Sequence, residues 1–256
     1  MKCAGIDIGS RSIELIVLRG DSVVASRRLD ATYDPVAQCR ALLDGASYEC
    51  LVATGYGRRL LADTLGVRTV SEIRAYALGA RHHFPRCRAV LDIGGQDTKA
   101  IALDKDGEVG KFELNDRCAA GTGKFLEFMA ASFQVPLEEF GRFALRGSPG
   151  IVISSMCTVF AETEVTSLIA QGKPPADVAL AVHGSVINRS LSMLRRVSTD
   201  TPLVFAGGVA RNACMVELLR REIPGEVLVP PAPEFTGALG AALCARKLVN
   251  QEPAAR

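Results

Sequence analysis

Short apolar runs alternate along the chain with longer stretches in which apolar residues recur at helical spacing. Apolar runs on either side of a short polar turn predict strand hairpins at 4–18 and 88–103. Further strands are predicted at 50–54, 108–114, 202–206 and 226–229. Helices are predicted at 35–45, 57–65, 71–83, 121–132, 136–146, 157–171, 175–197, 212–222 and 236–249. This alternation of strands and helices predicts an α/β fold.

The two hairpins repeat one sequence pattern. Residues 4–18 read AGIDIGSRSIELIVL and residues 89–103 read AVLDIGGQDTKAIAL, so that Asp7 aligns with Asp92 and the Asp-Ile-Gly turns coincide. We therefore expect two related lobes. One is formed by 1–85 together with about 232–256, and the other by 86–231.

Glycines in both turns favour phosphate binding, because the missing side chains let several backbone N–H groups approach phosphate oxygens. Asp7 and Asp92 stand two residues before the glycine that opens each turn. Mg²⁺ bound to phosphate takes one or two carboxylates and keeps several waters, which suits both acids. An ordinary hairpin turn explains a single copy equally well, whereas two copies favour the phosphate interpretation.

A third glycine element lies at 202–217, which reads PLVFAGGVARNACMVE. A strand runs into Gly207-Gly208 and then into a helix that starts near Asn212. This layout brings the backbone close to a flat ligand such as adenine and ribose, and a plain strand-to-helix turn is the alternative. The stretch TGALGAA at 236–242 has small residues spaced to let a helix pack tightly.

Composition narrows the class of protein. The chain has 256 residues, 48% of them hydrophobic and 23% charged, which excludes disordered and fibrous architectures. A net charge of +2 gives no electrostatic reason to expect a nucleic-acid or membrane partner. No apolar run has the length of a membrane span, and Asp7 interrupts the position where a signal peptide is apolar, so we expect a cytoplasmic protein.

Two of the eight cysteines differ from the rest in their surroundings. Cys118 and Cys157 each lie near the start of a predicted helix, where the partial positive charge of the helix N-terminus favours a thiolate. Two thiolates are half of the ligand set of a 4Fe-4S cluster, and a symmetric dimer would supply the other half. From the residues alone, a pair of buried structural cysteines stays open as the alternative.

Taken together, these motifs resemble the activators (ATPase components) of 2-hydroxyacyl-CoA dehydratases, a family that includes the ATPase subunits of benzoyl-CoA reductases. The NDRCAAGTG and CTVFAE segments are specific to this family, whereas the glycine motifs are shared with sugar kinases, actin and Hsp70. The matching segments are GIDIGS at 5–10, ATGYGR at 53–58, LDIGGQDTKAI at 91–101, NDRCAAGTGKFLE at 115–127, SSMCTVFAETEV at 154–165, AGGVARN at 206–212 and GALGAAL at 237–243.

The resemblance implies an actin-like, Hsp70-like and sugar-kinase-like ATPase fold with two related lobes around a nucleotide cleft. It implies ATP or ADP with Mg²⁺ as ligands, and a homodimer that shares one 4Fe-4S cluster held by Cys118 and Cys157. A reduced ferredoxin or flavodoxin would reduce this cluster. ATP binding and hydrolysis would then drive one low-potential electron to a cluster-bearing 2-hydroxyacyl-CoA dehydratase, or to a benzoyl-CoA-type reductase or another such acceptor.

The resemblance also implies roles for individual positions. Asp7, Gln96 and Asp97 would act in hydrolysis, with Gln96 or Asp97 orienting the attacking water. Asp7 and Asp92 would hold Mg²⁺, and Glu162 either contacts the nucleotide or forms a salt bridge. The residues that match the phosphate and adenosine motifs are Gly9, Ser10, Arg11, Ser12, Gly94, Gly95, Gln96, Gly207, Gly208 and Asn212.

The chain departs from the family pattern in the first turn. Arg11 stands where the family usually has a small residue, and Glu14 where it usually has a lysine. We expect Arg11 to supply charge to the phosphates, or ATP turnover to be weaker. Two other classes of function stay open, a small-molecule kinase and a nucleotide-dependent scaffold without iron; neither explains the two cysteine segments.

Overall fold

The computed structural model describes residues 1–154 and 157–251. The chain forms two compact units, each built on a five-stranded sheet. The first unit comprises Met1–Cys87, Leu103–Gly110 and the segment that begins at Pro230, and the second comprises Arg88–Ala102 and Lys111–Val229. Within the described ranges, no helix is both long and apolar enough to cross a membrane.

The first sheet has the strand order β3-β2-β1-β4-β5. Its strands are β1 (Lys2–Ile8), β2 (Ser12–Arg19), β3 (Ser22–Asp30), β4 (Cys50–Thr54) and β5 (Arg68–Thr69). The helices of this unit are α1 (Pro35–Leu43), α2 (Arg58–Leu65), α3 (Glu72–His83) and α9 (Thr236–Gln251), and a short 3-10 helix η2 (Pro233–Phe235) precedes α9.

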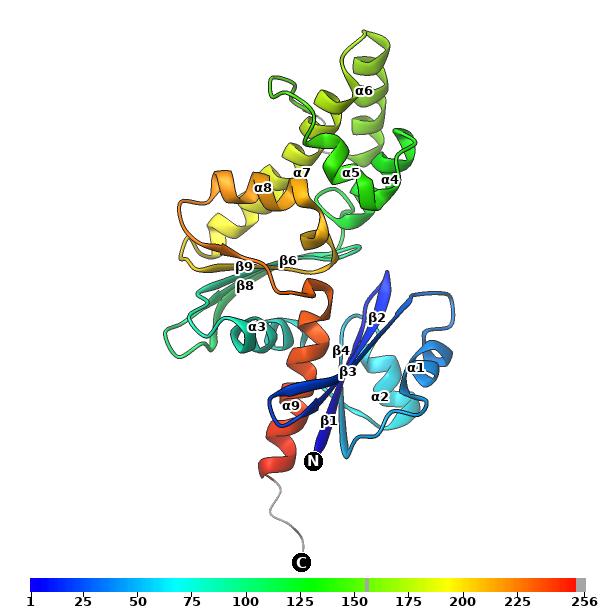
Figure 1. Ribbon diagram of the computed structural model, residues 1–256, viewed down its shortest axis with the longest axis vertical. Helices are drawn as coiled ribbons and strands as arrows, with labels where there is room; N and C mark the ends of the chain where they lie inside the picture. The colour runs from blue at the N-terminus through cyan, green and yellow to red at the C-terminus, as the bar shows by residue number, and fades with distance from the viewer. Residues whose placement is uncertain (155–156, 252–256) are drawn as a thin grey trace, which may run out of the picture. The chain divides into compact units, whose positions relative to one another are not determined.

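Strand β1 divides its side chains between two helical layers, because successive residues of a strand point to opposite faces. Ala4, Ile6 and Ile8 belong to one apolar core with residues of α1 and α2, while Cys3 packs with residues of α9 on the other face. Figure 1 shows α9 along one face of this sheet and α1 and α2 on the opposite face.

Helix α9 approaches its neighbours through glycines. A Cβ on Gly5 would lie 2.1 Å from the backbone nitrogen of Ala242, and a Cβ on Gly240 would lie 1.7 Å from the carbonyl oxygen of Ala75 in α3. Side chains at these two positions would therefore force the backbones apart. The close packing expected from the small residues at 236–242 is confirmed.

The second sheet has the strand order β10-β9-β6-β7-β8. Its strands are β6 (Ala89–Ile93), β7 (Thr98–Leu103), β8 (Val109–Asn115), β9 (Leu203–Ala206) and β10 (Val227–Leu228). The helices are α4 (Gly123–Ser132), α5 (Leu137–Ala144), α6 (Thr158–Ala170), α7 (Pro175–Val197) and α8 (Ala213–Glu222), with a 3-10 helix η1 (Gly208–Arg211) before α8.

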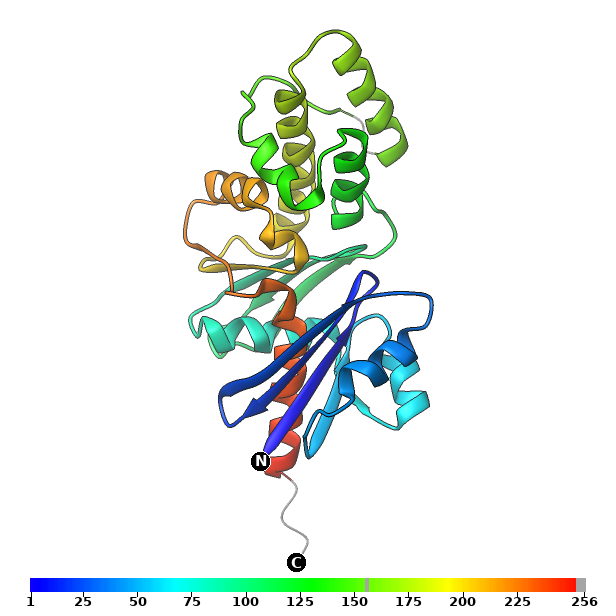
Figure 2. The same ribbon diagram turned by 45° about the vertical axis from the view of Figure 1, so that its right-hand side comes forward.

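One apolar core joins this sheet to its helices. Leu91 and Phe205 of the sheet belong to the same cluster as Phe140 of α5 and Val182 of α7. Figure 2 shows α4, α5 and α6 around the N-terminal half of α7, whose C-terminal half runs toward the sheet. The core therefore connects the helices that follow both candidate cysteines to the strands that carry the second glycine turn.

The strand pattern of the hairpin repeat recurs in the two sheets. In each, an antiparallel hairpin, β1–β2 or β6–β7, pairs through its first strand with a parallel strand, β4 or β9. Strand β3 was not expected from the sequence. It is an edge strand whose residues are mostly exposed, so it lacks the apolar run on which the strand predictions rested.

Candidate functional site

The two glycine turns are closed by the same hydrogen bond. The N–H of Gly9 donates to the carbonyl oxygen of Ser12 at 3.0 Å, and the N–H of Gly94 donates to that of Asp97 at 2.9 Å. Ser10, Arg11 and Gln96 are exposed at the turns, while Gly9, Ser12, Gly94 and Gly95 are half-buried. We call residues 9–12 the first turn and residues 94–97 the second turn. Both present backbone and polar groups to solvent, as phosphate binding requires.

Asp7 lies at the end of β1 in a space formed by glycines. Its side chain is buried. A Cβ on Gly55 would lie 2.4 Å from Asp7 Oδ1, and a Cβ on Gly237 would lie 2.0 Å from Asp7 Oδ2. Gly55 follows β4 with φ +90°, a backbone conformation that disfavours other residues. The carboxylate therefore fits only because two neighbouring segments lack side chains.

Asp92 occupies the matching position in the second unit, where it is fully buried. Lys99 Nζ lies 2.9 Å from Asp92 Oδ2 and 2.5 Å from Asp97 Oδ2, so one buried ammonium joins two candidate site carboxylates. A Cβ on Gly207, which has φ +82°, would lie 2.2 Å from Asp92 Oδ1. Gly207 therefore leaves space for the Asp92 carboxylate in the same way as Gly55 leaves space for the Asp7 carboxylate.

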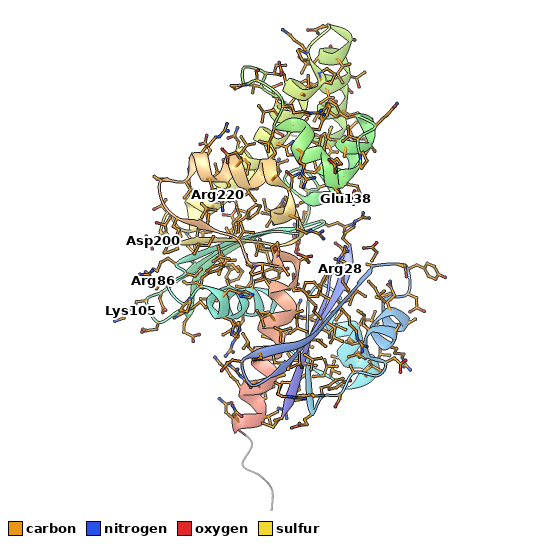
Figure 3. All side chains as sticks on the ribbon, in the orientation of Figure 1. Arg28, Arg86, Lys105, Glu138, Asp200 and Arg220 are labelled. Carbon is orange, nitrogen blue, oxygen red and sulfur yellow. The ribbon has the colours of Figure 1, made fainter. Side chains whose placement is uncertain are left out.

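Glu14 adds a second acid beside Asp7. The two residues are directly opposite each other on β2 and β1, so their side chains share one face of the sheet. Burial raises the pKa of Glu14 to about 7, although a hydrogen bond from Ser12 and the charge of Arg28 act in the other direction. Arg28, labelled in Figure 3, lies on the edge strand β3 opposite Glu14. Its Nε is 3.3 Å from Glu14 Oε1.

Three hydrogen bonds connect the second turn and the residue after it, Thr98, to the segment that carries Cys118. We call residues 118–124, which end in the first residues of α4, the cysteine loop. The N–H groups of Gly123 and Lys124 donate to the carbonyl oxygens of Gly94 and Gly95 at 2.9 and 2.8 Å. The hydroxyl of Thr98, which directly follows the second turn, donates to the carbonyl oxygen of Gly121 at 2.9 Å. A displacement of the second turn must therefore move the cysteine loop or break these bonds.

The cysteine loop also has an internal structure. Asn115 Nδ2 donates to the carbonyl oxygen of Cys118 at 3.2 Å, and the hydroxyl of Thr122 donates to that of Ala119 at 2.6 Å. Gly121 has φ +91° and lies against Arg189 of α7. Cys118 is half-buried in this loop, before Thr122, the N-cap residue of α4. The sequence predicted Cys118 near the start of a helix, and the structure has it in the loop that leads into α4.

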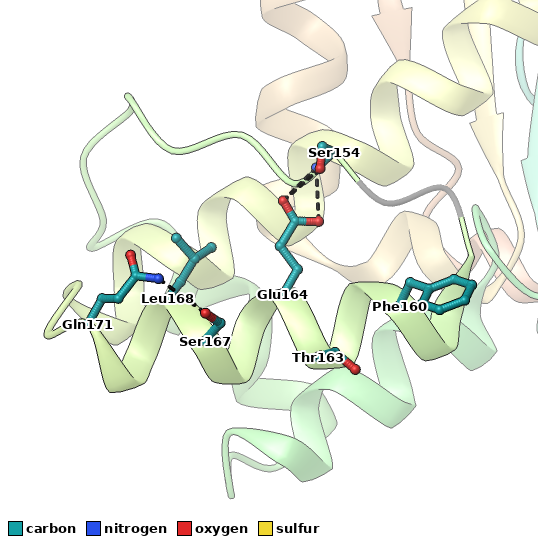
Figure 4. A pocket seen from close by; sticks show the side chains of 7 residues that line it. All are labelled: Ser154, Phe160, Thr163, Glu164, Ser167, Leu168 and Gln171. Atoms are coloured by element: carbon teal, nitrogen blue, oxygen red, sulfur yellow. Dashed lines mark hydrogen bonds between the residues drawn. The ribbon is translucent and has the colours of Figure 1, made fainter.

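Cys157 is exposed and is the N-cap residue of α6. Ser154, three residues earlier in the chain, is anchored to this helix, because its backbone N–H and its hydroxyl both donate to Glu164 Oε1 at 2.9 Å. Figure 4 shows this contact at one side of an open pocket on α6. The pocket is lined by Ser154, Phe160, Thr163, Glu164, Ser167, Leu168 and Gln171.

The other residues of the segment 154–165, which leads into α6, lie partly outside the described residues or have other contacts. Ser155 and Met156 of SSMCTVFAETEV lie outside the described residues. Glu162 is half-buried on α6, and its proposed contact with a nucleotide stays a prediction. Glu164, which the sequence interpretation did not assign, is the acid of this motif that accepts hydrogen bonds from Ser154.

The cysteines fit half of a cluster site. Cys118 and Cys157 are free thiols with some exposure, and they belong to the same unit. In the described part of the chain, no group of three or more histidine, cysteine, aspartate or glutamate side chains is placed to hold a metal ion. A four-ligand site built on these two thiols therefore requires ligands from outside one chain. For hydrated Mg²⁺, the buried carboxylates of Asp7 and Asp92 are ligands of the right chemistry.

The third glycine element forms a tight turn before α8. Gly207 is buried, Gly208 is exposed, and η1 follows directly. Asn212 caps α8, because its Oδ1 accepts the N–H groups of Cys214 and Met215 at 3.0 and 3.1 Å. The side-chain amide of Asn212 also contacts His183 of α7, with Nδ2 3.0 Å from Nε2.

Four residues that sequence reasoning did not assign contribute to this geometry. Gly55 and Lys99 were present in the quoted segments ATGYGR and LDIGGQDTKAI. Aligning the two hairpins singles out Lys99 opposite Glu14, and aligning the strands that pair with them singles out Gly55 opposite Gly207. Thr98 follows the second turn directly, but its partner Gly121 is distant in sequence. His183 is a single histidine in a long helix, and no local pattern signals its contact with Asn212.

The chain matches one protein-family model over almost its whole length. Residues 4–245 match the model of the BadF/BadG/BcrA/BcrD ATPase family. The chain is 39% identical over 261 residues to the activator of lactoyl-CoA dehydratase from Anaerotignum propionicum, covering 98% of this chain and all of that protein.

Solved structures give the same result. The activator of the 2-hydroxyisocaproyl-CoA dehydratase from Clostridium difficile, with bound ADPNP, is 36% identical and superposes with a TM-score of 0.90 over 98% of this chain and 96% of that chain. A ROK family glucokinase from Streptomyces griseus is 15% identical with a TM-score of 0.60, covering 96% of this chain and all of that chain, which shows a shared fold alone. The fold is therefore the actin-like and sugar-kinase-like ATPase fold expected from the resemblance, and the chain is an ATPase that belongs to the BadF/BadG/BcrA/BcrD ATPase family.

Proposed function

We propose that this ATPase is an activator that couples ATP binding and hydrolysis to one-electron transfer from a 4Fe-4S cluster to a 2-hydroxyacyl-CoA dehydratase. The observation that carries the proposal is the set of three hydrogen bonds between residues 94–98 and the cysteine loop. Neither a kinase nor a scaffold accounts for hydrogen bonds between a phosphate turn and a loop that carries a cysteine. The names of the relatives, activators of dehydratases, support the choice of partner.

The nucleotide is bound by the groups that the two turns present. In this proposal the first and second turns hold the phosphates, with Arg11 supplying a positive charge. Asp7 and Asp92 hold Mg²⁺ through its water shell, and Gln96 or Asp97 orients the attacking water. The turn at Gly207, Gly208 and Asn212 receives the adenosine end. The positions of both aspartates support their part, because each lies at the end of the strand that leads directly into its turn, buried beside the groups proposed to hold the phosphates.

The cluster is shared by two copies of the chain, each supplying Cys118 and Cys157. When bound, it supplies a carrier for one electron at low potential. Exposed apolar residues support a second copy at this place: Val159 and Phe160, two and three residues after Cys157, are 66% and 67% exposed. A reduced ferredoxin or flavodoxin is the proposed donor.

The chain's own residues connect the two sites. A phosphate that binds or leaves the second turn changes the positions of the Gly94 and Gly95 carbonyl oxygens. The N–H groups of Gly123 and Lys124 follow these oxygens, because breaking each hydrogen bond costs about 1 kcal/mol. The backbone at the start of α4 is thereby tied to the occupancy of the phosphate site.

The test is the iron content of protein purified without oxygen. We expect a brown protein with about four irons per pair of chains and a mass in solution equal to two chains. Cys118→Ala and Cys157→Ala remove the colour, whereas Cys244→Ala, a half-buried cysteine of the first unit, keeps it. A colourless wild-type protein after anaerobic reconstitution with iron and sulfide contradicts the proposal.

A further inference from the structure

His183 is a buried histidine that none of the proposed chemistry uses. It lies on α7 with no exposed surface, and its ring centroid is 4.7 Å from that of Phe140. Burial lowers the pKa of His183 to about 4, so the imidazole is neutral at neutral pH. A neutral imidazole has one N–H donor and one acceptor nitrogen.

The contacts of the ring fix which nitrogen carries the proton. Nδ1 lies 2.8 Å from the carbonyl oxygen of Ala179, which can only accept, so Nδ1 is the donor. Nε2 is then the acceptor, and it lies 3.0 Å from Nδ2 of Asn212. Each ring nitrogen therefore has a partner of the correct type.

The orientation of the Asn212 amide is fixed independently from its other end. Oδ1 must face the N–H groups of Cys214 and Met215, because only the oxygen accepts. This leaves Nδ2 to face His183, in agreement with the tautomer that Ala179 imposes. The amide of Asn212 is thus held in one orientation by the first turn of α8 on one side and by α7 on the other.

The surroundings leave little space for a different arrangement. A Cβ on Gly141 of α5 would lie 2.3 Å from Asn212 Oδ1, so α5 reaches this point through a residue without a side chain. The N–H of Asn212 donates to the carbonyl oxygen of Val209 at 2.9 Å, and that of Ala210 to Gly207 at 3.1 Å. These two hydrogen bonds connect the glycine turn to Asn212, so the position of Asn212 affects the position of the turn.

We propose that His183 is a positioning residue of the nucleotide site, which acts through Asn212 to hold the turn at 207–212 in the form that receives the adenosine end of a nucleotide. This inference rests on the proposed function only for the identity of the ligand. It predicts that loss of the acceptor at Nε2 weakens nucleotide affinity and leaves the hydrolytic groups of the two turns unchanged.

The test compares two substitutions that each keep one end of the ring. His183→Asn keeps a polar group near the position of Nδ1 and loses the acceptor, whereas His183→Gln places an amide oxygen near the position of Nε2. ADP affinity is measured by calorimetry on iron-free full-length protein, and the turnover number for ATP at saturation on protein purified without oxygen. We expect His183→Asn to weaken ADP binding roughly tenfold with turnover within roughly twofold, and His183→Gln to stay within roughly threefold of wild type in both.

A double-mutant cycle tests whether His183 acts through Asn212. Asn212→Ser keeps an oxygen to cap α8 and removes the donor to His183, so it also carries the test if His183→Asn does not fold. We expect Asn212→Ser to weaken ADP binding about as much as His183→Asn, and the double variant to show no further loss.

Other outcomes separate the inference from the proposed function. Wild-type affinity in His183→Asn, equal losses in His183→Asn and His183→Gln, or fully additive losses in the double variant overturn the positioning role alone. Absence of ADP binding by the wild-type protein overturns the nucleotide site, and with it both proposals.

Discussion

Glu14 and Lys99 occupy the same position in the two hairpins, with an acidic side chain in the first and a basic side chain in the second. Glu14 lies opposite Asp7 across β1 and β2, as Lys99 lies opposite Asp92 across β6 and β7. In the second unit an ammonium therefore neutralises the aspartate at the end of the strand, with its Nζ 2.9 Å away. In the first unit the corresponding cation is one strand further out, at Arg28, and contacts Glu14.

Removal of the Lys99 ammonium tests its part in the second unit. Lys99→Met leaves the buried Asp92 and the adjoining Asp97 without their shared cation, and we expect a loss of about 3 kcal/mol in the free energy of unfolding. ATP hydrolysis falls at least roughly tenfold, because the two carboxylates repel and leave their positions. The measurements are urea unfolding and steady-state hydrolysis. Lys111→Met, which removes an exposed hydrogen bond to Arg196, is the control, and equal behaviour of the two variants contradicts the role of Lys99.

Glu14 predicts a dependence of stability on pH. Its pKa in the folded protein is about 7, above the ordinary value of 4.5, so the folded state holds this proton more tightly than the unfolded chain. The stability that Glu14 contributes is therefore complete below pH 4.5 and is lost as the pH rises toward 7. Glu14→Gln does not titrate, and its free energy of unfolding relative to wild type should improve by up to about 3 kcal/mol between pH 4.5 and 8.

Urea unfolding at the two pH values measures this change. Glu108→Gln, at an exposed position, gives the control for loss of a carboxylate in general. A constant difference between Glu14→Gln and wild type across the pH range would show that Glu14 is not held in its protonated form.

The glycines around Asp7 predict a loss of activity from one methyl group. Gly237→Ala places a Cβ about 2 Å from Asp7 Oδ2 and displaces the carboxylate, and we expect ATP hydrolysis to fall at least roughly tenfold. Gly184→Ala, on α7 where a Cβ meets no atom within 4 Å, is the matched control and keeps wild-type hydrolysis. Wild-type rates in Gly237→Ala would show that Asp7 is not required at its observed position.

The Thr98 hydroxyl predicts how strongly the second turn and the cysteine loop are coupled. In iron-free protein, ADP should change the alkylation rate of the half-buried Cys118, measured residue by residue by mass spectrometry. Thr98→Val removes the hydrogen bond to Gly121 and should reduce this nucleotide effect roughly fivefold, whereas Thr98→Ser retains it. An equal nucleotide effect in both variants would place the coupling elsewhere.

Local sequence patterns predicted the elements more completely than the site. Helices α1 to α9 all have counterparts among the predicted helices, because their apolar periodicity and end signals are local. Strand β3 was not predicted, because an exposed edge strand carries no apolar run. The contacts of Thr98 with Gly121 and of His183 with Asn212 join residues more than twenty positions apart, and only the packed fold brings these partners together.

The most direct test of the central claim is an anaerobic redox titration of the iron-reconstituted protein with and without ATP and Mg²⁺. The account predicts a one-electron couple whose midpoint potential shifts by roughly 60 mV or more when ATP is bound, which corresponds to a coupling free energy of about 1.4 kcal/mol. It also predicts that Thr98→Val reduces this shift and that Cys118→Ala abolishes the couple. A potential that is the same with and without ATP would contradict the claim that the nucleotide site is coupled to the site formed by the cysteines.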